Sequence, residues 1–435
     1  MTAHDSQETS HHPIRKLFGS LPPLLWTFWI VLVALGCLTV LTQFYFSHTR
    51  HPAFYPFSSP LFQDYSHHFD FLVYKTRFQH FHQASFFNAW NWPYSYPASM
   101  AVIYKIFYAT GPRSLGVFLT FSALSYLIAT SLFTRALAKA GIAPLAAICF
   151  TLPVLFFSYP ARLQIFLANM EVMVFVVLTL GIWAYATKRD YLASACFAIA
   201  ASFKIFPFVF LALFYARRQY RQLLFGIAVL LGVTVASLWI LGPTLATAYH
   251  GIQAGVASFQ QIYVNQFNPL ESGMDHSLFG LIKIAIILMV RKTHFVKLAG
   301  PYLLLTATAG VVLYFLRIRH LPATNQVLVL GALSVLLPPV SHDYTLLNLY
   351  GPWAMLVLAI VHAARNGVRP RGAKAMLLCF AILFTAQNYL IFPVGVYDDL
   401  RVAGQLKAIT LLVLCGLALR YPLTAADPAT EPAAA

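Results

Sequence analysis

The chain has 435 residues, of which 59% are hydrophobic and 10% are charged. A soluble domain carries about 25% charged residues, so this composition excludes a soluble protein and indicates a polytopic membrane protein. The formal net charge of +16 does not predict a nucleic-acid partner here, because basic residues in membrane proteins collect in cytoplasmic loops and at lipid headgroups.

The apolar runs predict an all-α membrane fold with about 12 transmembrane helices. Residues 1–22 are expected to form a cytoplasmic tail, 23–421 a single transmembrane domain, and 422–435 a disordered tail. The first run is longer than the roughly 20 residues that span a bilayer, and no small-residue cleavage site follows it, so we interpret it as an uncleaved helix. The predicted spans are 24–46, 114–134, 142–158, 164–187, 191–203, 205–216, 222–241, 299–316, 324–337, 343–364, 374–392 and 403–420.

Two of these segments, 191–203 and 205–216, are too short for two full crossings. Pro207 follows the run "AASFKIF" and lies near the start of the second segment, and proline disrupts a helix interior. We therefore expect a short, broken helical hairpin, which is tolerated at membrane depth when it is buried in protein.

The basic residues predict the orientation. Most clusters fall on one side of the predicted spans, which should be the cytoplasmic side. Arg291, Lys292 and Lys297 break this pattern, so 277–290 is expected to be a partly embedded segment at the outer face. Most acidic residues then fall at outer helix ends or in outer loops; solubility or an outward-facing binding chamber would both explain this.

The first outer loop, 47–97, is the longest polar stretch between spans and is rich in aromatic residues. Loops of this length are usually functional when they are ordered. Trp92 and Tyr96 would suit an aromatic belt at the membrane interface or a stacking surface for sugar rings. The pairs His67/His68 and His80/His82 are too closely spaced for a facing helical pair of ligands, so neither a metal nor another cofactor is expected.

Several motifs, taken in order, resemble those of glycosyltransferase family 87, integral-membrane enzymes of the GT-C type. The resemblance covers about residues 65–350. It is carried by "DFLVY" at 70–74, "YSYPAS" at 94–99, "LQIFLANMEVMVFVVLTLG" at 163–181, "ASACFAIAASFKIFPFVFLALF" at 193–214 with the basic loop "YARRQYRQ", "DHSLFG" at 275–280 and "PVSHDYTLL" at 339–347.

The chain also departs from the family pattern. His342 stands where the family usually has tryptophan, and Tyr344 where histidine is common. Asp275 and His276 replace an Asn-Gln pair, and Glu171 lies near the family's asparagine at a helix start. We expect these differences to affect which donor and acceptor bind more than the type of reaction.

The resemblance implies transfer of a sugar, mannose most simply, from a polyprenyl-phosphate donor to a lipid-linked or glycan acceptor at the outer face of the cell membrane, with inversion. An acceptor hydroxyl needs a positioned base, and Asp70 would supply it, with Asp64 as the fallback. The leaving lipid phosphate needs cations or hydrogen-bond donors, for which Lys204, His342 and Arg162 are the candidates. The expected sugar- or acceptor-binding residues are Tyr74, Trp92, Tyr96, Asn169, Glu171, Asp275, His276, Asp343 and Tyr344.

Three alternatives remain. Asp70 would also suit the N-cap of a helix that begins at "FLVY". A transporter or lipid flippase would place Glu171 and Lys204 in its substrate path. A membrane acyltransferase would use His342 as its base.

Overall fold

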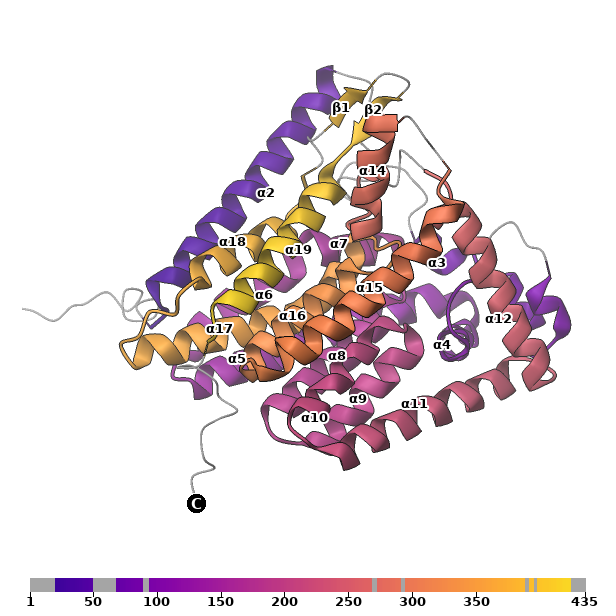
Figure 1. Ribbon diagram of the computed structural model, residues 1–435, viewed down its shortest axis with the longest axis horizontal. Helices are drawn as coiled ribbons and strands as arrows, with labels where there is room; N and C mark the ends of the chain where they lie inside the picture. Colours follow the sequence, from indigo (N-terminus) through magenta and orange to yellow (C-terminus); the bar gives the residue numbers. More distant parts are fainter. Residues whose placement is uncertain are drawn as a thin grey trace, which may run out of the picture.

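The computed structural model describes residues 20–49, 68–88, 94–267, 272–290, 294–387, 391–394 and 397–423, and this part of the chain is a bundle of helices with one small antiparallel hairpin (Figure 1). Its α-helices are α2 (Pro23–Thr49), α3 (Phe69–Leu72), α4 (Ala98–Tyr108), α5 (Ser114–Lys139), α6 (Pro144–Phe157), α7 (Tyr159–Leu167), α8 (Glu171–Ala186), α9 (Asp190–Phe203), α10 (Ala212–Ala216), α11 (Tyr220–Leu241), α12 (Leu245–Phe259), α14 (Leu278–Val290), α15 (Val296–Leu316), α16 (Ala323–Leu336), α17 (Tyr350–Arg365), α18 (Ala373–Leu383) and α19 (Ala403–Arg420). The shorter helical turns and the strands are η3 (Arg77–His80), η4 (Ala84–Phe87), η5 (Gly111–Arg113), η6 (Phe206–Leu211), η7 (Gln260–Val264), η8 (Ile318–His320), η9 (Asp343–Leu349), β1 (Ile391–Val394) and β2 (Tyr397–Arg401).

Six helices of the described chain are long and apolar enough to cross a bilayer, or seven if α6 and α7 form one bent span. This supports the prediction of a helical membrane protein. The number of about 12 spans stays a prediction, because many of the further segments that it counted are apolar helices of only 10–17 residues. The six long segments are Pro23–Thr42, Gly111–Lys139, Tyr220–Leu241, Val296–His320, Asp343–Arg365 and Ala403–Arg420.

Breaks between helices place polar residues inside the bundle. α6 and α7 are bent by 48°, with Ser158 between them and Pro160 in the first turn of α7. α9 ends at Phe203, and the 3-10 helix η6 begins at Phe206, so the chain breaks before Pro207 as the sequence predicted. Such breaks expose backbone and side-chain polar groups at membrane depth, where only other protein groups can bond them.

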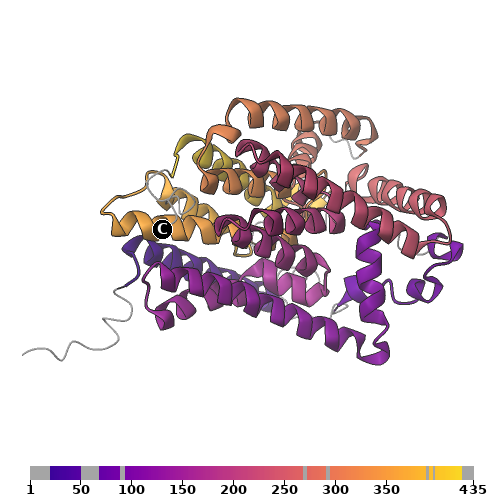
Figure 2. The same cartoon turned by 90° about the horizontal axis from the view of Figure 1, so that it is seen from below.

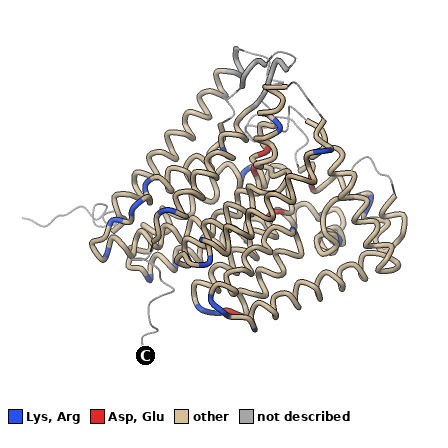
Figure 3. Tube along the Cα trace, in the orientation of Figure 1, with Lys and Arg blue, Asp and Glu red and all other residues tan. Residues whose placement is uncertain are grey.

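The bundle packs around the middle of the chain. α8 contacts α9, and α9 contacts α11, while α7 and α8 both contact the 3-10 turn η9. Seen from below, α5 and α15 lie on opposite sides of these elements (Figure 2). In Figure 3, many of the Lys and Arg residues lie toward the lower left and others lie in the upper and right parts, whereas several of the acidic residues lie inside the outline of the bundle. The ends of α7 and α9, the start of α8 and η9 therefore meet in the interior.

Candidate active site

Asp70, the expected base, is the second residue of the short helix α3. Its Oδ2 accepts a hydrogen bond of 2.7 Å from Asn169 Nδ2, and its backbone oxygen accepts one of 3.1 Å from the Tyr104 hydroxyl. The N-cap position of α3 is occupied by His68, whose φ of 65° lies in the left-handed region. Asp70 is therefore inside the helix rather than at its cap.

Asn169 lies in the turn between α7 and α8. The preceding Ala168 has a φ of 50°, a conformation that costs a non-glycine residue of order 1–3 kcal/mol and tends to occur at functional sites. The turn is held by Gln164, whose Nε2 donates to the Asn169 backbone oxygen at 2.7 Å. Asn169 Oδ1 in turn accepts the backbone N–H of Glu171 at 2.8 Å. The backbone oxygen and the side-chain oxygen of Asn169 are therefore both held, which fixes the amide nitrogen that donates to Asp70.

Glu171 and Lys204 form an ion pair next to this turn. Lys204 Nζ lies 2.7 Å from Glu171 Oε2, and Asn348 Nδ2 donates to Glu171 Oε1 at 2.5 Å. The Glu171 side chain is only 2% exposed, whereas that of Lys204 is 25% exposed. Because an ammonium has three donors, Lys204 can contact a ligand anion from its exposed side while it stays paired with Glu171.

Two of the expected phosphate-binding residues lie close to one tyrosine. Lys204 Nζ lies 5.6 Å from the centre of the Tyr344 ring, and His342 Nδ1 lies 3.2 Å from the Tyr344 hydroxyl. The sequence placed these three residues in one site, and the structure brings them together. Arg162 instead lines a separate cavity, described below.

The outer segment that contains Asp275 is joined to the segment before η9. Asp275 Oδ1 accepts the backbone N–H of Ser277 at 3.0 Å and that of Ser341 at 2.9 Å. The His276 N–H donates to the Ser341 backbone oxygen at 2.9 Å, and Asp275 pairs with His342 as an isolated antiparallel bridge. The carboxylate of Asp275 therefore organises the backbone that presents His342.

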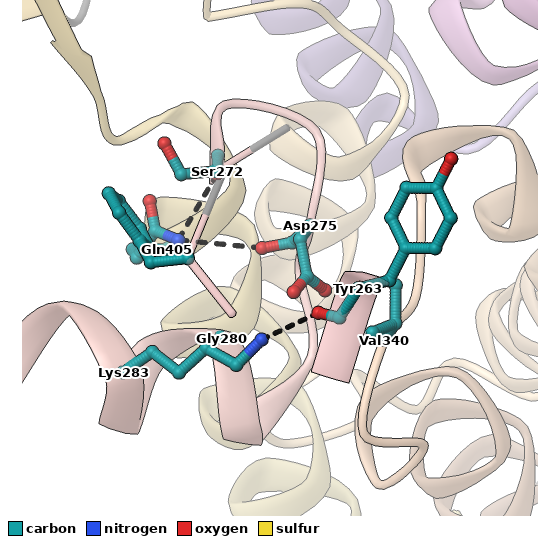
Figure 4. Close-up of a pocket in the computed structure, with 8 residues that line it drawn as sticks. Tyr263, Ser272, Asp275, Gly280, Lys283, Val340 and Gln405 are labelled. Carbon is teal, nitrogen blue, oxygen red and sulfur yellow. Dashed lines mark hydrogen bonds between the residues drawn. The ribbon is translucent and has the colours of Figure 1, made fainter. Parts of the chain in front are cut away.

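Beside this bridge lies a small cavity of about 20 Å³, which is room for one water molecule. Figure 4 shows Asp275 at its wall, with Gln405 donating to the Ser272 backbone oxygen at 3.2 Å and Lys283 donating to the Tyr263 backbone oxygen at 2.7 Å. Its size excludes a sugar, so we assign it no substrate.

A buried ion pair that the sequence analysis missed supports the first residue of η9. Lys407 Nζ lies 2.5 Å from Asp343 Oδ2, and both side chains are 1% exposed. Asp343 Oδ1 lies 3.2 Å from His276 Nδ1, and His276 Nε2 lies 3.1 Å from the Ser341 hydroxyl. Burial lowers the pKa of His276 against the opposing effect of Asp343. We therefore take His276 as neutral, donating from Nδ1 and accepting at Nε2.

This burial bears on the expected roles of Asp343 and His276. We expected both to touch sugar or acceptor, and that expectation stays a prediction. In the structure each is bonded to protein groups, and the contacts suit residues that hold η9 in place. Lys407 lies within the apolar run at 403–420, and a cation inside such a run was the signal that would have pointed to a buried ion pair.

Several aromatic residues in the described part of the first outer loop pack on one another. The Tyr74 ring is edge-on to those of Tyr94 and Tyr96, at 5.3 and 6.2 Å between ring centres. Burial, and then the charge of Asp70, raises the pKa of Tyr74 and of Tyr96. Both phenols therefore stay protonated at neutral pH and cannot act as the base. Asn169 Nδ2 also lies 3.4 Å from the Tyr96 hydroxyl, which places Tyr96 beside Asp70.

Two of the expected residues, Asp64 and Trp92, lie outside the described residues. Within the described ranges, no three His, Cys, Asp or Glu side chains are grouped so that they would hold a metal ion. Chemically, the assembled site offers a carboxylate that is held by an amide, with a paired lysine and a histidine–tyrosine pair near the same helix ends.

The family model described as glycosyltransferase family 87 matches residues 94–339. This match covers more than half of the chain and confirms the resemblance seen in the motifs. No curated protein and no solved structure gives a significant match to the chain.

Proposed function

Because this chain belongs to glycosyltransferase family 87, a family of sugar-transferring enzymes, we propose that it moves a mannosyl group from a polyprenyl-phosphate donor to a lipid-linked or glycan acceptor. In this proposal the enzyme resides in the cell membrane, with about 12 crossings of the GT-C type, and its site opens to the outer face. The observation that carries the proposal is the bond between Asp70 and Asn169, which holds a carboxylate beside the Lys204 ion pair.

Asp70 acts as the general base. The acceptor hydroxyl oxygen attacks the anomeric carbon of the donor sugar while its proton passes to the Asp70 carboxylate, and the bond from that carbon to the phosphate oxygen breaks. Asn169 fixes Oδ2 of Asp70, so the carboxylate is oriented before the acceptor arrives. A single displacement of this kind inverts the anomeric centre.

Lys204 and His342 stabilise the departing lipid phosphate. The leaving group gains negative charge as the sugar bond breaks, and cationic or hydrogen-bond donors aimed at that charge lower the barrier. Lys204 is held by Glu171, and His342 by Tyr344, so both are ordered before the donor binds. Glu171 has a positioning role here, because it is buried and bonded to Lys204 and Asn348.

The transporter alternative is not favoured. The family match supports a glycosyltransferase, and the Glu171–Lys204 pair that would have marked a transport path is joined through Asn169 to the proposed base.

The test is the variant Asp70→Asn. The amide oxygen of asparagine can still accept the bond from Asn169, so folding and donor binding should change little. Asparagine cannot take the proton at neutral pH, and turnover should fall by roughly 10²–10⁴-fold, the usual effect of losing a general base. The assay is transfer from labelled polyprenyl-phosphate mannose by the purified enzyme in detergent.

The matched control is Asp190→Asn, which removes another partly buried carboxylate, one paired with Arg217 and Gln219, and should leave turnover unchanged. Asp64→Asn should be milder than Asp70→Asn. If the folded Asp70→Asn enzyme transfers sugar at near the wild-type rate, Asp70 is not the base.

A further inference from the structure

A second cavity, of about 260 Å³, lies between α2, the bend from α6 to α7 and residues 384–386. The residues that line it do not include Asp70, Asn169, Lys204 or His342. An apolar cavity of about 150 Å³ already admits benzene, so this one has room for part of a hydrocarbon chain. It is therefore a separate candidate site, large enough for an apolar ligand.

The cavity borders the surface that α2 and α6 present to the bilayer. Trp29, Val33 and Gly36 lie on one face of α2, at the spacing of successive helical turns. At the rim, Val33 is 51% exposed, and Phe157 at the end of α6 is 72% exposed. α2 is one of the helices that is long and apolar enough to span a membrane. A lipid chain would thus reach the cavity sideways from the bilayer.

Arg162 is the one charged side chain among the described residues that line this cavity. Within the described part of the chain, its buried Nε has no hydrogen-bond partner. A buried donor of this kind normally has a partner, and a guanidinium suits the geometry of a phosphate group. The apolar walls of the cavity suit the hydrocarbon chain of a phospholipid, and the Arg162 donor suits its anionic phosphate.

We propose that this cavity binds a membrane phospholipid, with one acyl chain between α2 and α6 and the phosphate on Arg162. The polyprenyl-phosphate donor is a different ligand, because its phosphate must lie beside the acceptor and Asp70, which is not among the cavity's lining residues. The proposal thus assigns Arg162 to a second lipid, and it does not depend on sugar transfer.

The test uses Trp29, which stands in the cavity wall, as the reporter. The purified full-length protein in detergent is titrated with phosphatidylglycerol brominated on its acyl chains, because bromine quenches tryptophan fluorescence at short range. We expect saturable quenching that Trp29→Phe removes. Arg162→Gln should raise the half-saturating lipid concentration about 10- to 100-fold, the effect of losing one or two hydrogen bonds to a charged group. Arg135→Gln, at an exposed arginine of α5, should change nothing.

A second variant blocks the cavity without touching its charge. A Cβ added at Gly36 would have no atom of the described residues within 4 Å, so Gly36→Leu should fold normally and abolish the saturable quenching. Gly232→Leu on α11 is the matched control, because its Cβ likewise has no described neighbour within 4 Å. Quenching that survives both Arg162→Gln and Gly36→Leu would overturn the proposal. So would displacement by polyprenyl phosphate at lower concentration than by unlabelled phosphatidylglycerol, because the cavity would then hold the donor's tail.

Discussion

Replacing Lys407 by methionine should be among the most damaging single changes outside the proposed reacting groups. The side chain of Lys407 is 1% exposed and its Nζ lies 2.5 Å from Asp343. At an effective dielectric constant of about 20, two unit charges at this distance attract by about 7 kcal/mol. Much of this attraction offsets the cost of removing both ions from water. Methionine keeps the shape of the side chain but leaves Asp343 buried, with His276 as its one remaining side-chain partner among the described residues.

Removing one partner of a buried ion pair typically costs about 3–5 kcal/mol. We expect Lys407→Met to lower the free energy of unfolding by this amount. Asp343→Asn should cost a similar amount, because it leaves the ammonium unpaired. The double variant should cost clearly less than the sum, because it removes both charges together. We expect a coupling energy of at least about 2 kcal/mol, within the range known for contacting residues.

The measurement is an SDS titration in detergent micelles, followed by far-UV circular dichroism, for the four members of this double-mutant cycle. The control is Arg217→Met, which breaks a partly exposed pair with Asp190 at 3.7 Å and should cost no more than about 1 kcal/mol. Strict additivity of the Lys407 and Asp343 variants would refute the reasoning, because the two charges would then not stabilise each other.

Two further predictions concern the site and its support. Lys204→Ala should weaken equilibrium binding of labelled polyprenyl phosphate about 10- to 100-fold. Lys204→Arg should restore only part of the affinity, because the planar guanidinium differs from an ammonium. An unchanged affinity in the alanine variant would show that Lys204 does not bind the phosphate. Gly404→Ala should cost about 1–3 kcal/mol of unfolding free energy, because its Cβ would lie 2.4 Å from the Asp275 backbone oxygen. Gly416→Ala on the same helix α19 should be neutral, because its Cβ would meet none of the described residues within 4 Å. Equal effects of the two substitutions would contradict the close packing inferred at Gly404.

The order of the motifs in the sequence picked out several residues that the structure brings close together. Asp70 comes from one motif, and Asn169 and Glu171 come from another about 100 residues later. The structure joins the two motifs through hydrogen bonds of Asn169 to Asp70 and to the Glu171 backbone. Lys204 and His342 likewise meet at Tyr344. Motif order was informative here because each motif falls at a helix end, and these ends gather at one place in the bundle.

The partners of these residues were harder to predict. The sequence suggested a phosphate-binding role for Lys204 but did not predict its ion pair with Glu171. That pair depends on how α9 packs against α8, which helical periodicity does not specify. Arg162 was expected near the same phosphate. Where the Arg162 side chain lies depends on the 48° bend between α6 and α7. A proline in the sequence indicates that a helix bends, but it does not give the direction of the next helix.

The Lys407–Asp343 pair also has a consequence for how the protein is made. The two residues are 64 positions apart, and synthesis proceeds at roughly 5–20 residues per second, so about 3–13 s separate their emergence from the ribosome. During that interval the carboxylate of Asp343 has no cation from α19. The negative charge of Asp343 therefore has no partner from α19 until that helix has entered the membrane. A nascent chain halted before residue 407 would carry an uncompensated acid in its core, and such a product should be recognised and degraded by membrane proteases rather than accumulate.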